Sequence, residues 1–196
     1  MKGTNGVMRL LQTLAILASA GTLAACLSSN ELRAQLGVIE TRDTMVEGIN
    51  SAAVAIWDIA HEAQGEDGEL DPVRMTDDKW EQLRDEAKEL QTWSQMMAEA
   101  DVIHATGPNV AGNQVPEGVA SRAEIQAMID ANPDLFREKA RDLNERAGLL
   151  LAAARARDAA AAGHRAAEID VPCQGCHTRY WYKQGSPQVE DRRPSG

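Results

Sequence analysis

From residue 31 onward, apolar side chains recur every three or four residues along almost the whole chain, and no stretch shows the alternation typical of a strand. Helical segments are therefore predicted at residues 31–63, 76–104, 133–157 and 159–183. The connections between them are mostly short, so neighbouring helices are expected to run in opposite directions. The spacing predicts an all-α protein folded as an antiparallel four-helix bundle.

Several helix boundaries carry recognisable capping signals. Thr76 is a good N-cap for the second helix, and a capping box opens a short extra helix at 121–131. Pro133, directly after an asparagine, suits the first position of the third helix. Residues 64–75 and 105–120 are rich in glycine and proline and are predicted to be loops.

The first 25 residues are predicted to be a secretory signal peptide. Lys2 and Arg9 precede an apolar run that is too short for a transmembrane helix. The tetrad Leu23-Ala24-Ala25-Cys26 resembles a bacterial lipobox, in which cleavage before the cysteine leaves its sulfur to carry a diacylglycerol. The alternative is a plain signal peptide cut near Ala25, with Cys26 an incidental thiol.

The remaining chain is predicted to form one helical domain, 26–183, followed by a flexible tail, 184–196, that contains two prolines and two glycines. The formal net charge is −10, and no basic stripe is present. Such an acidic domain repels nucleic acid, so no nucleic-acid partner is expected. The acidity instead favours solubility or steering toward a basic partner protein.

Residues 173–177 read Cys-Gln-Gly-Cys-His, the C-x-x-C-H signature of covalent haem c attachment. Both thiols must reach haem vinyl groups while the imidazole reaches the iron, and on a helix positions 173, 176 and 177 share one face. A thioredoxin-like site would need a βαβ pattern, a zinc site would need further ligands, and a disulfide across one helical turn would be strained. We therefore expect one haem c, bound by Cys173 and Cys176, with His177 as the proximal iron ligand.

An exported four-helix chain with this motif in its last helix, followed by Tyr180, resembles the class II cytochromes c, the cytochrome c-prime superfamily, over about residues 31–183. The resemblance implies that the last helix carries the attachment cysteines and the proximal histidine. It also implies that the first helix lines the distal face of the haem.

In this superfamily an arginine of the first helix often approaches the haem propionates, and a residue about one turn later faces the iron. The corresponding stretch here offers Arg42, Met45 and Val46. Arg42 either binds a propionate or extends to solvent at the edge of the apolar stripe. Met45, the only side chain there with a donor atom, is predicted as the sixth ligand, whereas Val46 at the usual offset would leave the iron five-coordinate. Trp181 replaces the arginine that many members carry after the aromatic residue.

The resemblance implies a periplasmic one-electron carrier that serves redox partner proteins of the periplasmic electron-transfer chain. A five-coordinate haem protein that binds nitric oxide or carbon monoxide is the alternative. Peroxidase-like catalysis is not expected, because the first helix offers no distal histidine and Asp43 and Glu47 are expected to face outward. A lipid anchor would hold the protein to a membrane. Leu27 after the lipidated cysteine favours the outer one, by resemblance to other lipoproteins, and both a monomer and a homodimer remain open.

Overall fold

A computed structural model of the chain describes residues 37–105, 117–183 and 185. The predicted signal peptide, Cys26 and most of the predicted tail lie outside the described residues, as does most of the predicted loop 105–120. Within the described ranges, no helix is both long enough and apolar enough to cross a membrane.

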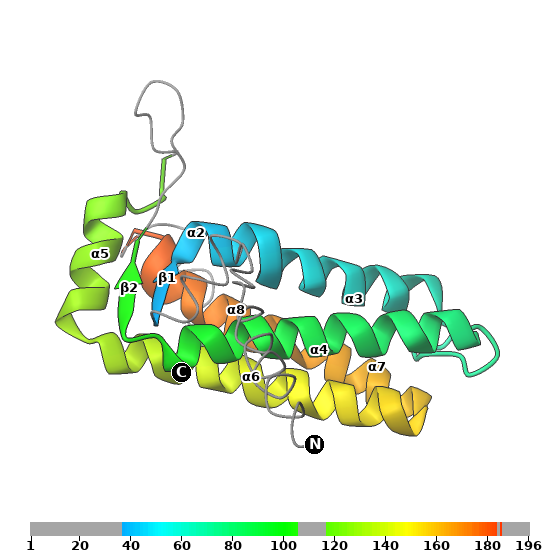
Figure 1. The fold of residues 1–196 in the computed structure, drawn as a ribbon. Coiled ribbons are helices and arrows are strands. Elements are labelled where there is room, and N and C mark those ends of the chain that lie inside the picture. The colour runs from blue at the N-terminus through cyan, green and yellow to red at the C-terminus, as the bar shows by residue number, and fades with distance from the viewer. Residues whose placement is uncertain (1–36, 106–116, 184, 186–196) are drawn as a thin grey trace, which may run out of the picture.

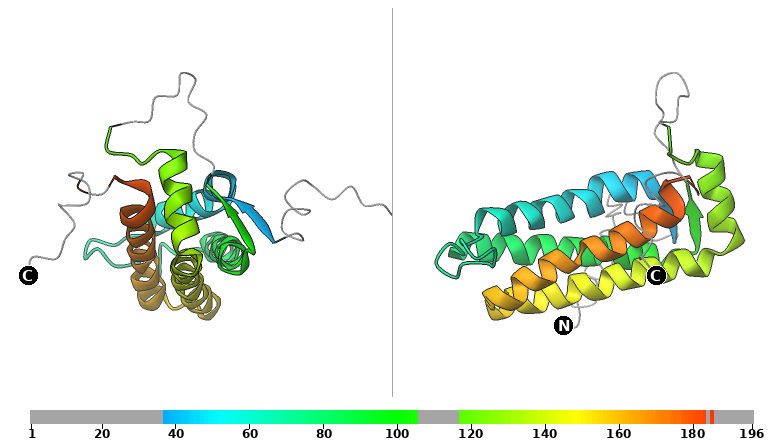
Figure 2. Two further views of the ribbon diagram at one scale, coloured as in Figure 1. Left: turned by 90° about the vertical axis from the view of Figure 1, so that its left-hand side faces the viewer. Right: turned by 180° about the vertical axis from the view of Figure 1, so that it is seen from behind.

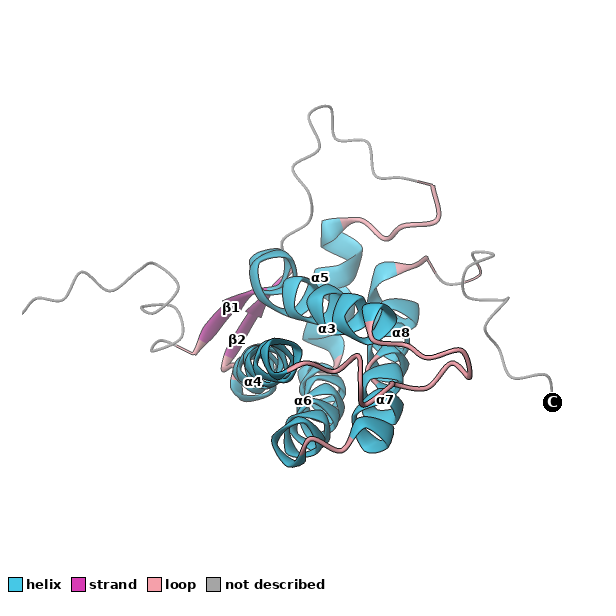
Figure 3. Cartoon of the chain, turned by 90° about the vertical axis from the view of Figure 1, so that its right-hand side faces the viewer, coloured by secondary structure: helices cyan, strands magenta, loops and turns pink. Residues whose placement is uncertain are grey.

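Four helical rods lie side by side and account for most of the described chain, and consecutive rods run in opposite directions (Figure 1). Views from behind and along the rods show the same arrangement (Figures 2 and 3). The prediction of an all-α protein is confirmed. The first rod comprises α2 (Thr41–Asp43), the π-helical turn η1 (Thr44–Ile49) and α3 (Asn50–Glu62); the second is α4 (Asp77–Glu99); the third is α6 (Pro133–Ala156); the fourth comprises α7 (Ala159–Glu168), α8 (Asp170–Cys176) and the π-helical turn η2 (His177–Trp181).

The apolar stripes of the four rods meet in one core. Its most completely buried large side chains are less than 2% exposed and include Ile56, Leu83, Leu90, Leu150 and Ile169. Each such side chain contributes roughly 1.5–3 kcal/mol to folding through burial of apolar surface. Many of the remaining core positions are alanine, which brings the rods close together.

The predicted capping signals operate as expected. The Thr76 side chain accepts a hydrogen bond from the Lys79 backbone N–H at 3.3 Å. α5 (Arg122–Ala131) opens with a complete capping box between Ser121 and Glu124. These contacts pair backbone N–H groups that the first helical turn would otherwise leave without partners.

The last rod is interrupted where proline predicts it. α7 ends at Glu168 and α8 begins at Asp170, so Pro172 lies in the first turn of the new helix. In the first turn of a helix the missing N–H of proline costs no hydrogen bond. The break also spares the proline ring the clash that it would have, in a continuous helix, with the carbonyl four residues earlier. The prediction that Pro172 kinks or restarts the helix is confirmed.

The predicted start of the first helix and the predicted end of the second are wrong. β1 (Val38–Glu40) precedes the first rod, and β2 (Val102–His104) follows α4, which ends at Glu99. The two strands pair in parallel, with Val38 opposite Val102. Three-residue strands are too short to produce visible alternation, and their pairing supplies hydrogen-bond partners to backbone groups beyond the helix ends.

α5 lies across one end of the bundle, beside β2 (Figure 1). The side-chain amide of Gln126 donates to the Ile103 carbonyl at 3.1 Å and accepts from the Ala105 N–H at 2.7 Å. Arg122 Nε adds a bond to the Ala105 carbonyl at 2.7 Å. α5 is thereby tied to the chain that leaves the second rod.

The segment before α5 is tied to the last rod. The Ala120 N–H donates to the Trp181 carbonyl, and the Lys183 N–H donates to the Gly118 carbonyl, both at 2.8 Å. Between them, Val119 and Tyr182 form an antiparallel bridge. Segment 117–131, which we call the cap, therefore joins the ends of the second and fourth rods.

Candidate functional site

A cavity of about 450 Å³ lies between the first and last rods, at the end of the bundle that the cap covers. Its volume falls within the range of small-molecule and cofactor sites. The walls are mostly apolar: η1 and α3 contribute Met45, Val46, Ile49 and Trp57, while α4, α5 and α6 contribute Met97, Ile125 and Phe136. The opposite wall comes from α8 and η2.

That opposite wall holds the whole C-x-x-C-H motif. Cys173, Cys176 and His177 all line the cavity from the last rod and are partly buried. Both thiols are free, and no disulfide joins them. The structure therefore brings two thiols and one imidazole together at the edge of one apolar space.

Burial determines the protonation state of the two thiols. Desolvation, followed by the nearby Asp170 carboxylate, raises the pKa of Cys173 to about 11. Desolvation, followed by Cys173, raises the pKa of Cys176 to about 12, although Lys139 acts in the opposite direction. Both remain protonated at neutral pH, unlike the low-pKa thiolates of disulfide oxidoreductases.

A π-helical turn occurs on each side of the cavity. In η1 the Asn50 N–H points to the Met45 carbonyl, and in η2 the Tyr182 N–H donates to the His177 carbonyl at 3.0 Å. Such turns are wider than an α-helical turn and are frequent at functional sites. Here they coincide with the predicted distal and proximal ligands.

The widened turn η1 changes which residues of the first rod face the cavity. Cavity-lining positions follow two rows with a spacing of four residues: Thr41, Met45, Ile49, Ala53 and Trp57, and beside them Arg42, Val46 and Asn50. A regular α-helix would rotate such rows away from one face within a few turns. Met45 and Val46 consequently both line the cavity, so the geometry alone does not select one of them.

Arg42 lies at the rim of the cavity. Its side chain is 49% exposed, and its guanidinium lies 3.7 Å from Asp43 Oδ1. A half-exposed arginine at the rim agrees with both predicted placements, binding of a propionate and extension to solvent.

Two buried polar atoms beside the cavity have no hydrogen-bond partner among the described residues: Tyr180 Oη and Gln174 Oε1. Tyr180 is 4% exposed, and its ring packs edge-on against Phe136 with centroids 5.4 Å apart. Orphaned polar atoms of this kind indicate a site that a bound group or ordered water completes. Together with the cavity volume, the apolar walls and the thiol and imidazole donors, they fit a haem.

Met97 was not predicted to belong to the site. It is 5% exposed and brings a second thioether to the cavity from α4. Its position on the apolar stripe of α4 indicates burial, but the local sequence carries no signal that this part of the stripe borders a cavity. Ile125 and Phe136 were missed for the same reason.

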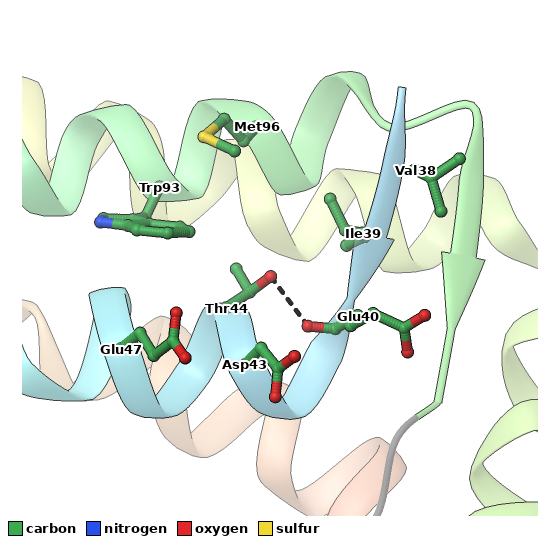
Figure 4. Close-up of a pocket in the computed structure, with 8 residues that line it drawn as sticks. All are labelled: Val38, Ile39, Glu40, Asp43, Thr44, Glu47, Trp93 and Met96. Atoms are coloured by element: carbon green, nitrogen blue, oxygen red, sulfur yellow. Dashed lines mark hydrogen bonds between the residues drawn. The ribbon is translucent and has the colours of Figure 1, made fainter. Parts of the chain in front are cut away.

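Asp43 and Glu47 lie on the other side of η1. They border a small hollow of about 20 Å³ between β1, η1 and α4, together with Trp93 and Met96 (Figure 4). Neither carboxylate lines the large cavity. The expectation that both face away from the distal site agrees with this placement.

Comparison with known protein families identifies a match. A family model described as Cytochrome C' matches residues 73–181, which is more than half of the chain. The matched region includes Cys173, Cys176 and His177, but it begins after the first rod, which carries Arg42 and Met45. No curated protein and no solved structure matches the chain.

Proposed function

The chain belongs to the cytochrome c' family, and from that premise we propose that it carries one covalent haem c and acts as a one-electron carrier. The observation that supports this most directly is the convergence of two thiols and an imidazole on one mostly apolar cavity of about 450 Å³. A bound haem supplies an iron that takes up and releases a single electron.

The roles of the last rod follow from its chemistry. Cys173 and Cys176 would hold the ring through thioether bonds, because a thiol S–H can add across a vinyl double bond without an oxidant. His177 is the proximal iron ligand, and its ring is flanked by Trp181 at a centroid distance of 6.5 Å.

The roles of the first rod are proposed from its cavity-facing rows. Met45 supplies a thioether as the sixth ligand, and Arg42 at the rim pairs with a propionate. Held by His177 and Met45 in both oxidation states, a bound haem would change oxidation state with little rearrangement, which suits electron transfer. The apolar walls protect the ring from water.

A second function is favoured by the position of Val46. It lines the cavity next to Met45, and its side chain cannot bind a metal. If Val46 rather than Met45 lies over the iron, the protein has an open, apolar distal site that suits nitric oxide or carbon monoxide. In that case it is a gas-binding protein.

We further propose export to the periplasm and a lipid anchor at Cys26, on the strength of the lipobox-like tetrad. Eleven residues lie between Cys26 and Val38, where β1 begins at the cavity end of the bundle. Such a connection spans at most about 40 Å. An anchor there keeps the haem site near the membrane surface and near membrane-bound redox partners.

The ferric and ferrous optical spectra of the matured protein test the choice between these functions. Thioether ligation predicts a low-spin ferric spectrum with the weak long-wavelength band typical of His/Met haems, together with slow carbon monoxide binding. Met45→Ala should abolish the band and open the iron to carbon monoxide. Val46→Ala is the matched control and should leave the band in place. A wild-type protein that is already high-spin and binds carbon monoxide readily refutes electron transfer through a Met45-ligated haem in favour of gas binding.

A further inference from the structure

The indole of Trp93 lies directly against the backbone of Gly48, in the turn η1 that carries Met45 and Val46. A methyl group at Gly48 would overlap three indole atoms, Cγ, Cδ2 and Cε2. Glycine is therefore the residue that permits this approach, and the contact is with a rigid ring rather than the movable end of a flexible side chain.

The indole itself is held in place. Trp93 Nε1 donates to Glu89 Oε1 at 2.8 Å, one turn earlier on α4. Figure 4 shows the ring over η1, on the side of Thr44 and Glu47. Thr44 and Gly48 are both buried on this side, and the Thr44 hydroxyl donates to the Glu40 carbonyl at 2.9 Å. The η1 turn is thus fixed on its α4 side.

The other side of the same turn faces the large cavity through Met45, Val46 and Ile49. Because the contact with Trp93 fixes one side of η1, it also fixes how far the opposite side of η1 extends into the cavity. We propose that Gly48 and Trp93 are a positioning pair that sets how far η1 reaches into the haem cavity, and hence how the distal side chain meets the iron. This inference rests on the proposed haem site, but it does not depend on whether Met45 or Val46 lies over the iron.

The test uses matured, haem-loaded protein. Gly48→Ala forces η1 away from the indole, so it should change the ferric spin-state equilibrium, or the carbon monoxide affinity of a five-coordinate protein, by at least about threefold, within the range of couplings for residues in contact. Amide hydrogen exchange in residues 44–50 should also accelerate, which is a readout independent of the iron.

Gly148→Ala is the matched control. Gly148 also lies within a helix, α6, and a methyl group there would come 2.8 Å from the Nε2 atom of Gln91, a flexible side chain that can move aside. Gly148 does not line the cavity. This variant reports the general effect of replacing a helical glycine by alanine, and it should leave the spectrum and the exchange of residues 44–50 unchanged.

The pair is tested by a double-mutant cycle. Leucine at position 93 removes the ring from the path of the added methyl group, so Gly48→Ala should have a much smaller effect in a Trp93→Leu background. An equal effect in both backgrounds, or a Gly48→Ala spectrum identical to wild type, overturns the proposal. If Gly48→Ala does not mature, Trp93→Ala removes the indole without adding an atom. It should also change the ferric spin-state equilibrium or the carbon monoxide affinity and accelerate exchange in residues 44–50, because η1 loses the contact that fixes its depth. An unchanged Trp93→Ala protein also overturns it, whereas failure of the wild-type protein to bind haem refutes the proposed function instead.

Discussion

Replacing Gln126 by methionine should loosen the cap over the haem cavity at a cost that the structure makes calculable. Residues 103 and 105 are two apart in an extended segment, so their backbone groups point to the same side of it. On that side the Gln126 amide pairs with the Ile103 carbonyl and the Ala105 N–H. Methionine has nearly the same shape but pairs with neither. Ala105 is 1% exposed, so its N–H would remain without a partner.

Each buried backbone group left unpaired costs about 1–3 kcal/mol. Because both bonds are only partly buried, we expect the two losses together to lower the free energy of unfolding by about 2–4 kcal/mol. The assay is urea denaturation of the haem-loaded protein, followed by both far-ultraviolet circular dichroism and the haem absorbance.

Gln95→Met is the matched control for this variant. Gln95 lies on the exposed face of α4, and among the described residues its amide bonds to Glu99 Oε1, at 2.9 Å. Its replacement should change stability by less than about 0.5 kcal/mol. If Gln126→Met lowers the free energy of unfolding no more than Gln95→Met does, the bonds from the Gln126 amide to the backbone of residues 103 and 105 do not stabilise the cap. The account of the cap is then wrong.

Three further predictions concern other contacts. The Ser121 hydroxyl, followed by its backbone N–H, holds the pKa of Glu124 below its usual 4.5, so the capping box stabilises α5 above that pH and is lost as the pH falls below it. Hydrogen exchange in α5 should therefore accelerate at low pH in the wild type. In Glu124→Gln the exchange should depend little on pH. Trp57 Nε1 donates to the Ala166 carbonyl at 3.2 Å and links α3 to α7, so Trp57→Phe should lower the free energy of unfolding by about 1–2 kcal/mol in urea denaturation. Thr76→Ala removes the N-cap of α4 and should cost about 1 kcal/mol, measured by thermal denaturation.

The features that were predictable from the sequence depend on residues close together in the chain. Thr76 and the Ser121–Glu124 capping box mark helix starts because each bonds within one turn. Pro172 marks the break in the last rod for a similarly local reason. The C-x-x-C-H motif fixes its own geometry, because all three side chains share one helical face.

The features that were not predictable depend on contacts between distant segments. β1 and β2 form because two rod ends more than sixty residues apart lie side by side, which no local pattern records. The orientation of Met45 and Val46 was predicted from a regular helical period, which the π-helical turn η1 breaks. Met97 borders the cavity only because α4 packs against the first rod at that point.

The central claim, covalent haem on the last rod, is tested most directly by intact-protein and peptide mass spectrometry after acid–acetone extraction. The protein should be produced in a host that matures c-type cytochromes. The account predicts that the chain keeps the mass of one haem, that the added mass maps to the peptide containing Cys173 and Cys176, and that neither thiol reacts with an alkylating reagent. Haem that extracts completely, leaving both thiols open to alkylation, would contradict it.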